Sequence, residues 1–111
     1  MKRLMRMVFL GLVLLLETAP VRADLVARYT FDDGTAVDSS GNGNDGAIFG
    51  GVTAVTDAVQ GNVLNFNGAN GSYIRVAHSP SLDNITGAIT IAMWLNTSNT
   101  STRQIIEKGG T

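Results

Sequence analysis

The chain has 111 residues, no cysteine, and a net charge of −1 from eight basic and nine acidic side chains. Residues 24–111 keep four of the basic and eight of the acidic side chains, which gives this part a net charge of −4. That charge disfavours binding to a nucleic-acid backbone, which needs clustered Lys and Arg, and without cysteine the chain can form neither disulfide bonds nor a lipid-modified cysteine anchor.

The first residues predict a cleaved secretory signal. Basic side chains precede the uncharged apolar run 7–16, and Val21 and Ala23 are the small residues that a signal peptidase recognises. The apolar run is too short for a membrane anchor, which needs about twenty residues. We therefore expect a signal peptide over 1–23, cleavage after Ala23, bacterial export, a secreted or cell-surface location, and no stable membrane insertion afterwards.

The remaining chain reads as all-β. Strand-like runs alternate with turn signals, and they cover 25–30, 47–49, 62–66, 73–76, 89–96 and 104–108. The run 89–96 is apolar on both alternating faces, so we expect a central strand with Trp94 in the core. No segment shows a helical stripe. Asn-Gly pairs mark turns, and 67–72 is expected to link two antiparallel strands.

Residues 31–46, FDDGTAVDSSGNGNDG, form the most distinctive segment after the signal. Four glycines and two asparagines accompany the carboxylates of Asp32, Asp33, Asp38 and Asp45. Such a composition predicts a turn-rich loop that lies outside the core and offers many oxygen ligands.

Six pieces in order resemble the laminin-G-like, concanavalin-A-like jelly-roll family: LVARYTFDDG, DSSGNGNDG, VLNFNGANGSYIRV, HSPSLDN, ITIAMWLN and IIEKGG. The resemblance covers 24–110. It implies an antiparallel β-sandwich, a secreted setting, frequent Ca²⁺, and carbohydrate or protein ligands. Domains of that family run well past 111 residues, so we expect 24–111 to be the N-terminal part of such a jelly roll, incomplete at the C-terminus and poorly stable alone.

The 31–46 loop is also a candidate calcium site. Oxygen-bearing side chains alternate from Asp38 onward as in an EF-hand loop, but Phe49 stands where the bidentate glutamate is needed. A calcium site at the sandwich rim remains open, and the alternative is a turn whose side chains bond their own backbone. The candidate ligands are Asp32, Asp38, Asn42 and Asn44.

The sequence offers no catalytic site. Glu107 is the only glutamate after the signal, whereas glycoside hydrolysis normally needs two carboxylates, so we read it as a solvated charge. His78 is the only histidine, there is no GxSxG motif, and zinc is disfavoured, so His78 reads as a loop residue.

Sugar binding would use aromatic faces, and Tyr73 beside a Gly/Asn loop is the expected ligand-binding residue. These observations favour a secreted, non-catalytic module that binds a glycan or an extracellular protein, with Ca²⁺ as a structural cofactor. The alternatives are an accessory domain of a larger secreted glycoside hydrolase and a structural adhesion domain without a glycan site.

Overall fold

A computed structural model describes residues 23–109, which separate into two units, 23–77 and 78–109. The predicted signal segment, apart from Ala23, lies outside the described residues. Within the described part of the chain, no helix has the length and apolar character that crossing a bilayer requires.

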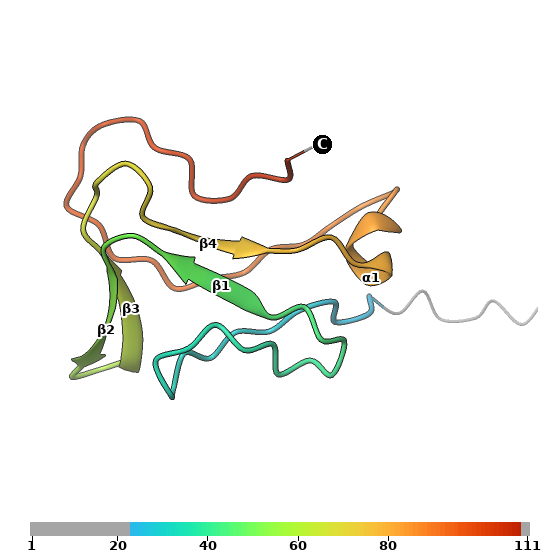
Figure 1. Ribbon diagram of the computed structural model, residues 1–111, viewed down its shortest axis with the longest axis horizontal. Helices are drawn as coiled ribbons and strands as arrows, with labels where there is room; N and C mark the ends of the chain where they lie inside the picture. Colours follow the sequence, from blue (N-terminus) through green and yellow to red (C-terminus); the bar gives the residue numbers. More distant parts are fainter. Residues whose placement is uncertain (1–22, 110–111) are drawn as a thin grey trace, which may run out of the picture. The chain divides into compact units, whose positions relative to one another are not determined.

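The first unit holds four strands in two small antiparallel sheets (Figure 1). β1 (Gly46–Phe49) pairs with β4 (Tyr73–Val76), and β2 (Val52–Asp57) pairs with β3 (Gly61–Phe66). The described residues are therefore mostly β with almost no helix, and the strands expected at 47–49, 62–66 and 73–76 are confirmed.

The β1–β4 ladder follows the alternation of its side chains. Ile48 and Ile74 face each other on the more buried side, whereas Phe49 and Tyr73 face each other on the exposed side. The two aromatic rings stack with centroids 4.9 Å apart and planes inclined by 23°. β-Branched and aromatic cross-strand pairs of this kind stabilise a two-stranded ladder.

The β2–β3 hairpin adds a strand that the sequence pattern did not predict. Its register runs from Val52 opposite Phe66 to Asp57 opposite Gly61. The Asp57 carboxylate closes the turn by accepting hydrogen bonds at 2.8 Å from the amides of Val59 and Gln60. The segment 67–72 does connect two strands, but β3 and β4 belong to different sheets and do not pair with each other, because each already has another partner.

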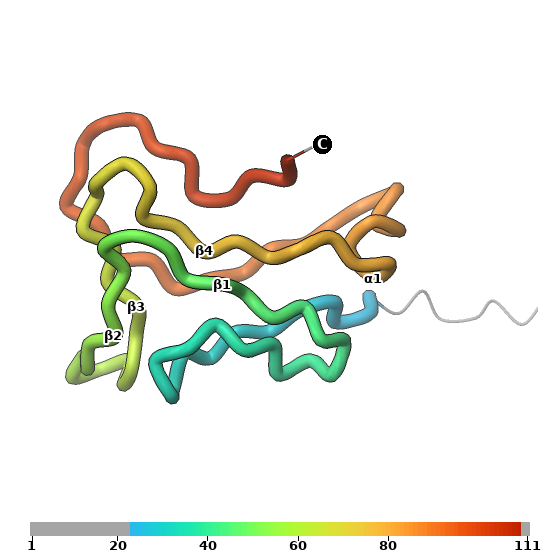
Figure 2. Tube along the Cα trace, in the orientation of Figure 1, coloured from blue at the N-terminus to red at the C-terminus, as the bar shows by residue number. Residues whose placement is uncertain are grey.

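Residues 23–45 form an irregular segment that continues into β1 (Figure 2). Two isolated bridges hold it, Tyr29 with Asp38 and Ala36 with Gly46. Ala36 is the buried hydrophobic residue of this region, and a Cβ on Gly46 would lie 2.9 Å from the Ala36 Cβ and 2.6 Å from Ile74 Cγ2. The strand expected at 25–30 is wrong, because its only ladder contact is the single bridge at Tyr29.

The second unit contains one helical turn, α1 (Pro80–Asp83). Ser79 caps it, with its hydroxyl accepting from the Leu82 amide at 3.3 Å, and Pro80 occupies the first helical turn, where its missing N–H costs nothing. The sequence has no helical stripe here, so its pattern does not predict this turn.

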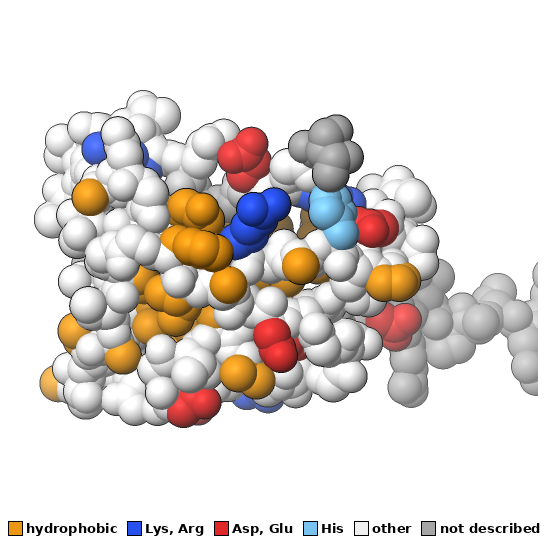
Figure 3. All heavy atoms as spheres, in the orientation of Figure 1, with side chains coloured by type: hydrophobic (Ala, Val, Ile, Leu, Met, Phe, Trp, Pro, Cys, Tyr) orange, Lys and Arg blue, Asp and Glu red, His pale blue; other side chains and the backbone are white. Residues whose placement is uncertain are grey.

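The strands expected at 89–96 and 104–108 are absent from the described structure. Past Ile85, the described residues of this unit make no backbone-to-backbone hydrogen bond, so they form no ladder. A strand needs a neighbour, whatever its side-chain pattern. The core position expected for Trp94 is also wrong, since this side chain is 87% exposed. Figure 3 shows further apolar side chains exposed on the face that it draws.

Candidate functional site

The carboxylate of Asp38 organises the distinctive loop. Oδ1 accepts hydrogen bonds from the amides of Arg28 at 2.9 Å and Ser40 at 2.8 Å. Oδ2 accepts from the amide of Asn44 at 2.9 Å and from the Ser40 hydroxyl at 2.8 Å. Asp38 is 8% exposed and Asn44 is 2% exposed. The prediction that this segment lies outside the core is wrong at these two residues, because hydrogen bonds compensate their burial.

These contacts decide how Asp38 titrates. Burial raises the pKa of its carboxyl, but the hydrogen bonds from Arg28, Ser40 and Asn44 together outweigh burial and lower the pKa to about 2. Burial, followed by the negative charges of Asp38 and Asp45, raises the pKa of the Tyr29 phenol. The loop therefore favours a charged Asp38 beside a neutral Tyr29.

The side chains around Asp38 fasten the loop to the segment before it. The Asn44 amide nitrogen donates to the Val26 carbonyl at 2.8 Å, and the Asn42 amide nitrogen donates to the Leu25 carbonyl at 2.8 Å. In return, the Tyr29 hydroxyl donates to the Asn44 carbonyl at 2.6 Å. The predicted turn is therefore a packed junction between two stretches of chain.

The four predicted calcium ligands hold different hydrogen-bonding positions in this arrangement. Calcium takes six to eight oxygens, but both Asp38 oxygens already accept two protein donors each. The side-chain amide nitrogens of Asn42 and Asn44 face carbonyls, and Asp32 makes no contact with the other three ligands. In the part of the chain that the structure describes, no three His, Cys, Asp or Glu side chains gather as a metal ion requires.

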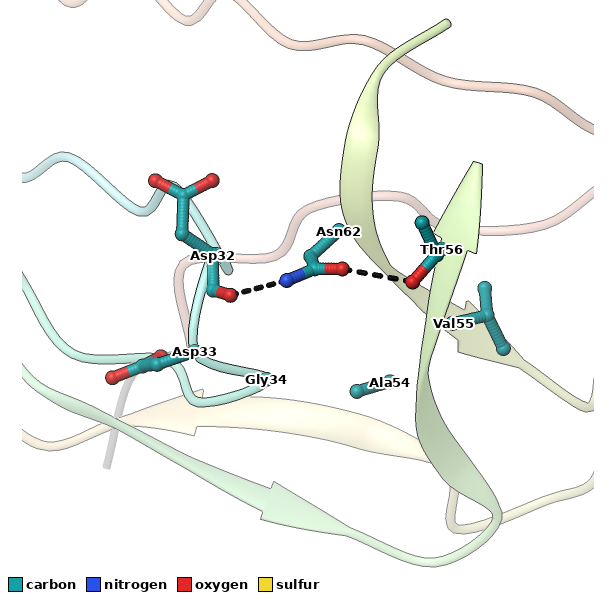
Figure 4. A pocket seen from close by; sticks show the side chains of 7 residues that line it. All are labelled: Asp32, Asp33, Gly34, Ala54, Val55, Thr56 and Asn62. Carbon is teal, nitrogen blue, oxygen red and sulfur yellow. Dashed lines mark hydrogen bonds between the residues drawn. The ribbon is translucent and has the colours of Figure 1, made fainter. Parts of the chain in front are cut away.

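A second arrangement brings Asp32 to a hollow of about 260 Å³ (Figure 4). Asp32, Asp33 and Gly34 line it from the loop, and the β2–β3 hairpin lines it with Ala54, Val55, Thr56 and Asn62. A Cβ on Gly34 would lie 2.9 Å from the Ala54 Cβ, so only glycine allows the loop to approach the hairpin this closely.

The backbone before this hollow is strained. Phe31 has a φ of +60°, which is unusual for a bulky side chain, and its carbonyl accepts from the Gly34 amide at 2.9 Å. The resulting turn presents the Asp32 carbonyl to the hairpin, where the Asn62 amide nitrogen donates to it. Strain of this kind costs about 1–3 kcal/mol and tends to occur at functional sites.

Some polar groups of the hollow hydrogen-bond to other protein groups and others do not. The Thr56 hydroxyl donates to Asn62 Oδ1 at 3.0 Å, and Asp33 Oδ1 accepts from the hydroxyl and amide of Thr35 at 2.6 and 2.9 Å. The Thr35 contacts lower the pKa of Asp33. Within the described residues, no group donates to the Asp32 carboxylate. The two carboxylates point in different directions in Figure 4 and do not converge on one atom.

The other predicted residues do not line this hollow. Tyr73 is 44% exposed and stacks on Phe49. His78 pairs with Asp83 at 3.0 Å on the surface of the second unit, and the Glu107 side chain is exposed. Sequence reasoning missed Thr56, because β2 was not predicted, and it treated Asn62 only as a strand residue. A pair of polar side chains beside the hairpin turn, at the end of β2 and the start of β3, would have been the signal to follow.

Comparisons with protein-family models, with curated proteins and with solved structures found no match to this chain.

Proposed function

We propose that this chain is a secreted, non-catalytic module with a laminin-G-like jelly-roll fold, and that it binds carbohydrate in the hollow between residues 32–34 and the β2–β3 hairpin. The observation that carries the proposal is the set of hydrogen-bonding groups around that hollow. Its volume of about 260 Å³ is slightly below the usual range for small-molecule sites, which suits a single sugar ring better than a larger ligand.

The hollow offers mostly acceptors. Within the described residues, the Asp32 carboxylate accepts from no protein donor, and the Thr56 oxygen retains acceptor capacity after donating to Asn62. The Asn62 amide supplies a remaining N–H donor. A ligand that matches this set carries several hydroxyl donors, which is the chemistry of a sugar or polyol.

The charge of the hollow narrows the ligand class. Two carboxylates and no Lys or Arg line it, so a phosphate or an acidic sugar would meet repulsion. Gly34 and Ala54 provide a small apolar surface against which the C–H face of a neutral ring can pack. The proposed ligand is therefore a neutral glycan. The exposed ring of Tyr73 is a separate surface on which another sugar unit of the same glycan stacks.

We propose binding rather than hydrolysis at this hollow because of how its two carboxylates are placed. Asp32 and Asp33 are neighbours on one loop and point in different directions, whereas hydrolysis needs two carboxylates on opposite sides of the scissile bond. As alternatives, the module serves as the accessory domain of a larger glycoside hydrolase, or it acts as an adhesion domain without a glycan site.

The test is a titration of the ¹⁵N-labelled chain with neutral monosaccharides, followed by amide chemical shifts. Glucose, galactose, mannose and arabinose should be compared with glucuronate at equal concentration. We expect saturable shifts at 32–34 and 54–62 with at least one neutral sugar, and weaker binding of glucuronate because of the two carboxylates.

Asp32→Asn and Asn62→Ala should each weaken this binding by about tenfold, since each removes a hydrogen-bonding group of the hollow. Asp24→Asn is the matched control, because it removes an exposed carboxylate that does not line the hollow. A folded chain that shows no saturable shift with any sugar would refute the proposal, and an equal effect of Asp24→Asn would place the site elsewhere.

A further inference from the structure

Three asparagines of the first unit are each followed by glycine, and they are Asn42, Asn67 and Asn70. An asparagine side chain can react with the backbone amide nitrogen of the next residue, and a glycine there has no Cβ to obstruct the approach. All three asparagines are exposed. The next residue and the exposure are therefore alike at the three positions, and the hydrogen bonds of each side chain distinguish them.

Two of these side chains are held by the fold. The Asn42 amide nitrogen donates to the Leu25 carbonyl at 2.8 Å. Asn67 Oδ1 accepts from the Ala69 amide at 3.0 Å and from the Ser72 hydroxyl at 2.7 Å. Each side chain must leave these partners before its Cγ can turn to the amide of the following glycine, so the hydrogen bonds slow the reaction.

The Asn70 side chain, in contrast, makes no hydrogen bond within the described residues. The amide nitrogen of Gly71, which would be the attacking atom, also donates to no group in that part of the chain. The two residues form the centre of a turn, which the Ser72 amide closes by donating to the Ala69 carbonyl at 3.2 Å. Asn70 can therefore turn toward its neighbour without breaking a protein contact.

We propose that Asn70 is a site of spontaneous modification, at which the side-chain amide becomes a carboxylate through a cyclic imide. The Gly71 amide nitrogen gives up its proton and bonds to Asn70 Cγ, while the Cγ–Nδ2 bond breaks and ammonia leaves with that proton. Water then opens the imide at either carbonyl, which gives aspartate or isoaspartate. No atom is oxidised or reduced, and water is the co-reactant. This inference does not rest on the carbohydrate proposal.

The modification changes the turn that leads into β4. Both products add a negative charge, and isoaspartate also adds a methylene group to the main chain. The turn is tightly packed on one side, since a Cβ on Gly50 would overlap the Gly71 carbonyl oxygen. Tyr73, which stacks on Phe49, follows within two residues. Isoaspartate at this turn should therefore weaken the β1–β4 ladder at its aromatic end.

The test is incubation of the full chain in mildly alkaline buffer, with timed samples digested by chymotrypsin and analysed by mass spectrometry. Cleavage after Phe49 and Phe66 separates Asn42 from the other two sites, and fragment ions separate Asn67 from Asn70. Each conversion raises the mass of its peptide by about 1 Da. We expect Asn70 to react about tenfold faster than the other two, because each hydrogen bond that must break slows a step by about fivefold.

The same incubation in concentrated urea is the control for sequence, because unfolding removes the hydrogen bonds and leaves each asparagine followed by glycine. The three rates should then converge. Ser72→Ala removes the hydroxyl that donates to Asn67 Oδ1, so Asn67 should react about fivefold faster in the folded chain, with Asn42 unchanged.

Two kinds of result would overturn the proposal. One is an Asn70 in the folded chain that reacts no faster than Asn42 or Asn67. The other is an order of rates that persists in urea, or an Asn67 that Ser72→Ala does not accelerate, since hydrogen bonding would then not be what selects Asn70.

Discussion

Replacing Asp38 by asparagine tests whether one carboxylate holds the 31–46 loop together. The new side chain keeps an oxygen for the amides of Arg28 and Ser40, but it presents an NH₂ group where Oδ2 accepts from the Asn44 amide. Two donors then face each other in a buried position. We expect a lower melting temperature at pH 7, with the loop around Asn44 as the most affected region.

The pH dependence gives the quantitative form of this prediction. The carboxyl has a pKa of about 2 in the folded chain against an ordinary value of 3.8. Since the folded pKa is depressed, its contribution to stability is complete above about pH 4 and is lost as the pH falls toward 2. At pH 3 the carboxyl binds about 0.9 proton when unfolded and about 0.1 when folded, so unfolding takes up about 0.8 proton.

The assay is urea unfolding followed by circular dichroism at steps between pH 2 and pH 6. The slope of unfolding free energy against pH reports the number of protons taken up. At pH 3 the slope of the wild type should exceed that of Asp38→Asn by about 0.8 proton. Coincident slopes for wild type and Asp38→Asn would refute the assigned hydrogen-bond network.

Three further changes test other parts of the fold. Gly46→Ala should lower the free energy of unfolding by about 1–3 kcal/mol in a denaturant titration, because the added methyl would lie too close to Ala36 and Ile74. Gly87→Ala is the control, because its methyl meets open space, and it should change the free energy of unfolding by less than about 0.5 kcal/mol. A double-mutant cycle of Phe49→Ala and Tyr73→Ala should give a coupling energy of about 0.5–1.5 kcal/mol, and a value near zero would argue against the stack. Tyr29→Phe should lower the melting temperature at pH 7 and flatten the loss of stability above pH 10, because the folded phenol has a raised pKa and favours its neutral form; an unchanged alkaline slope would contradict this.

Local patterns predicted the strands whose partners lie within the first unit. β4, with its β-branched and aromatic side chains, was predicted from residue type alone, as was most of β3. β2 was missed because Val55 breaks the alternation of VTAVTD, and its ladder with β3 decides the structure there. In contrast, 89–96 has the strongest local strand pattern but no ladder, because pairing depends on a neighbour that local sequence does not specify.

The role of Asp38 could not be read from composition. Aspartate is mostly exposed in proteins, so an Asp-, Asn- and Gly-rich segment suggests a solvated loop. Here two of the donors come from Arg28 and Asn44, which lie on either side of it in the chain, and their convergence appears only in three dimensions. The hollow beside Asp32 could not be predicted from the sequence for the same reason, because Thr56 and Asn62, which line it, belong to a hairpin distant from Asp32 in the chain.

The β2–β3 hairpin lies between β1 and β4 in the sequence, and this position bears on the order in which the two sheets fold. β2 and β3 are joined by a tight turn, so their pairing closes a very short loop, whereas β1 must find β4 across the whole span from Gly50 to Ser72. Loop-closure entropy grows with the number of free residues. Once the hairpin has formed, only Gly50, Gly51 and the residues from Asn67 to Ser72 remain free, which brings β1 and β4 within easy reach of each other. We therefore expect the inner hairpin to form first, and the outer ladder with its aromatic pair to form after it.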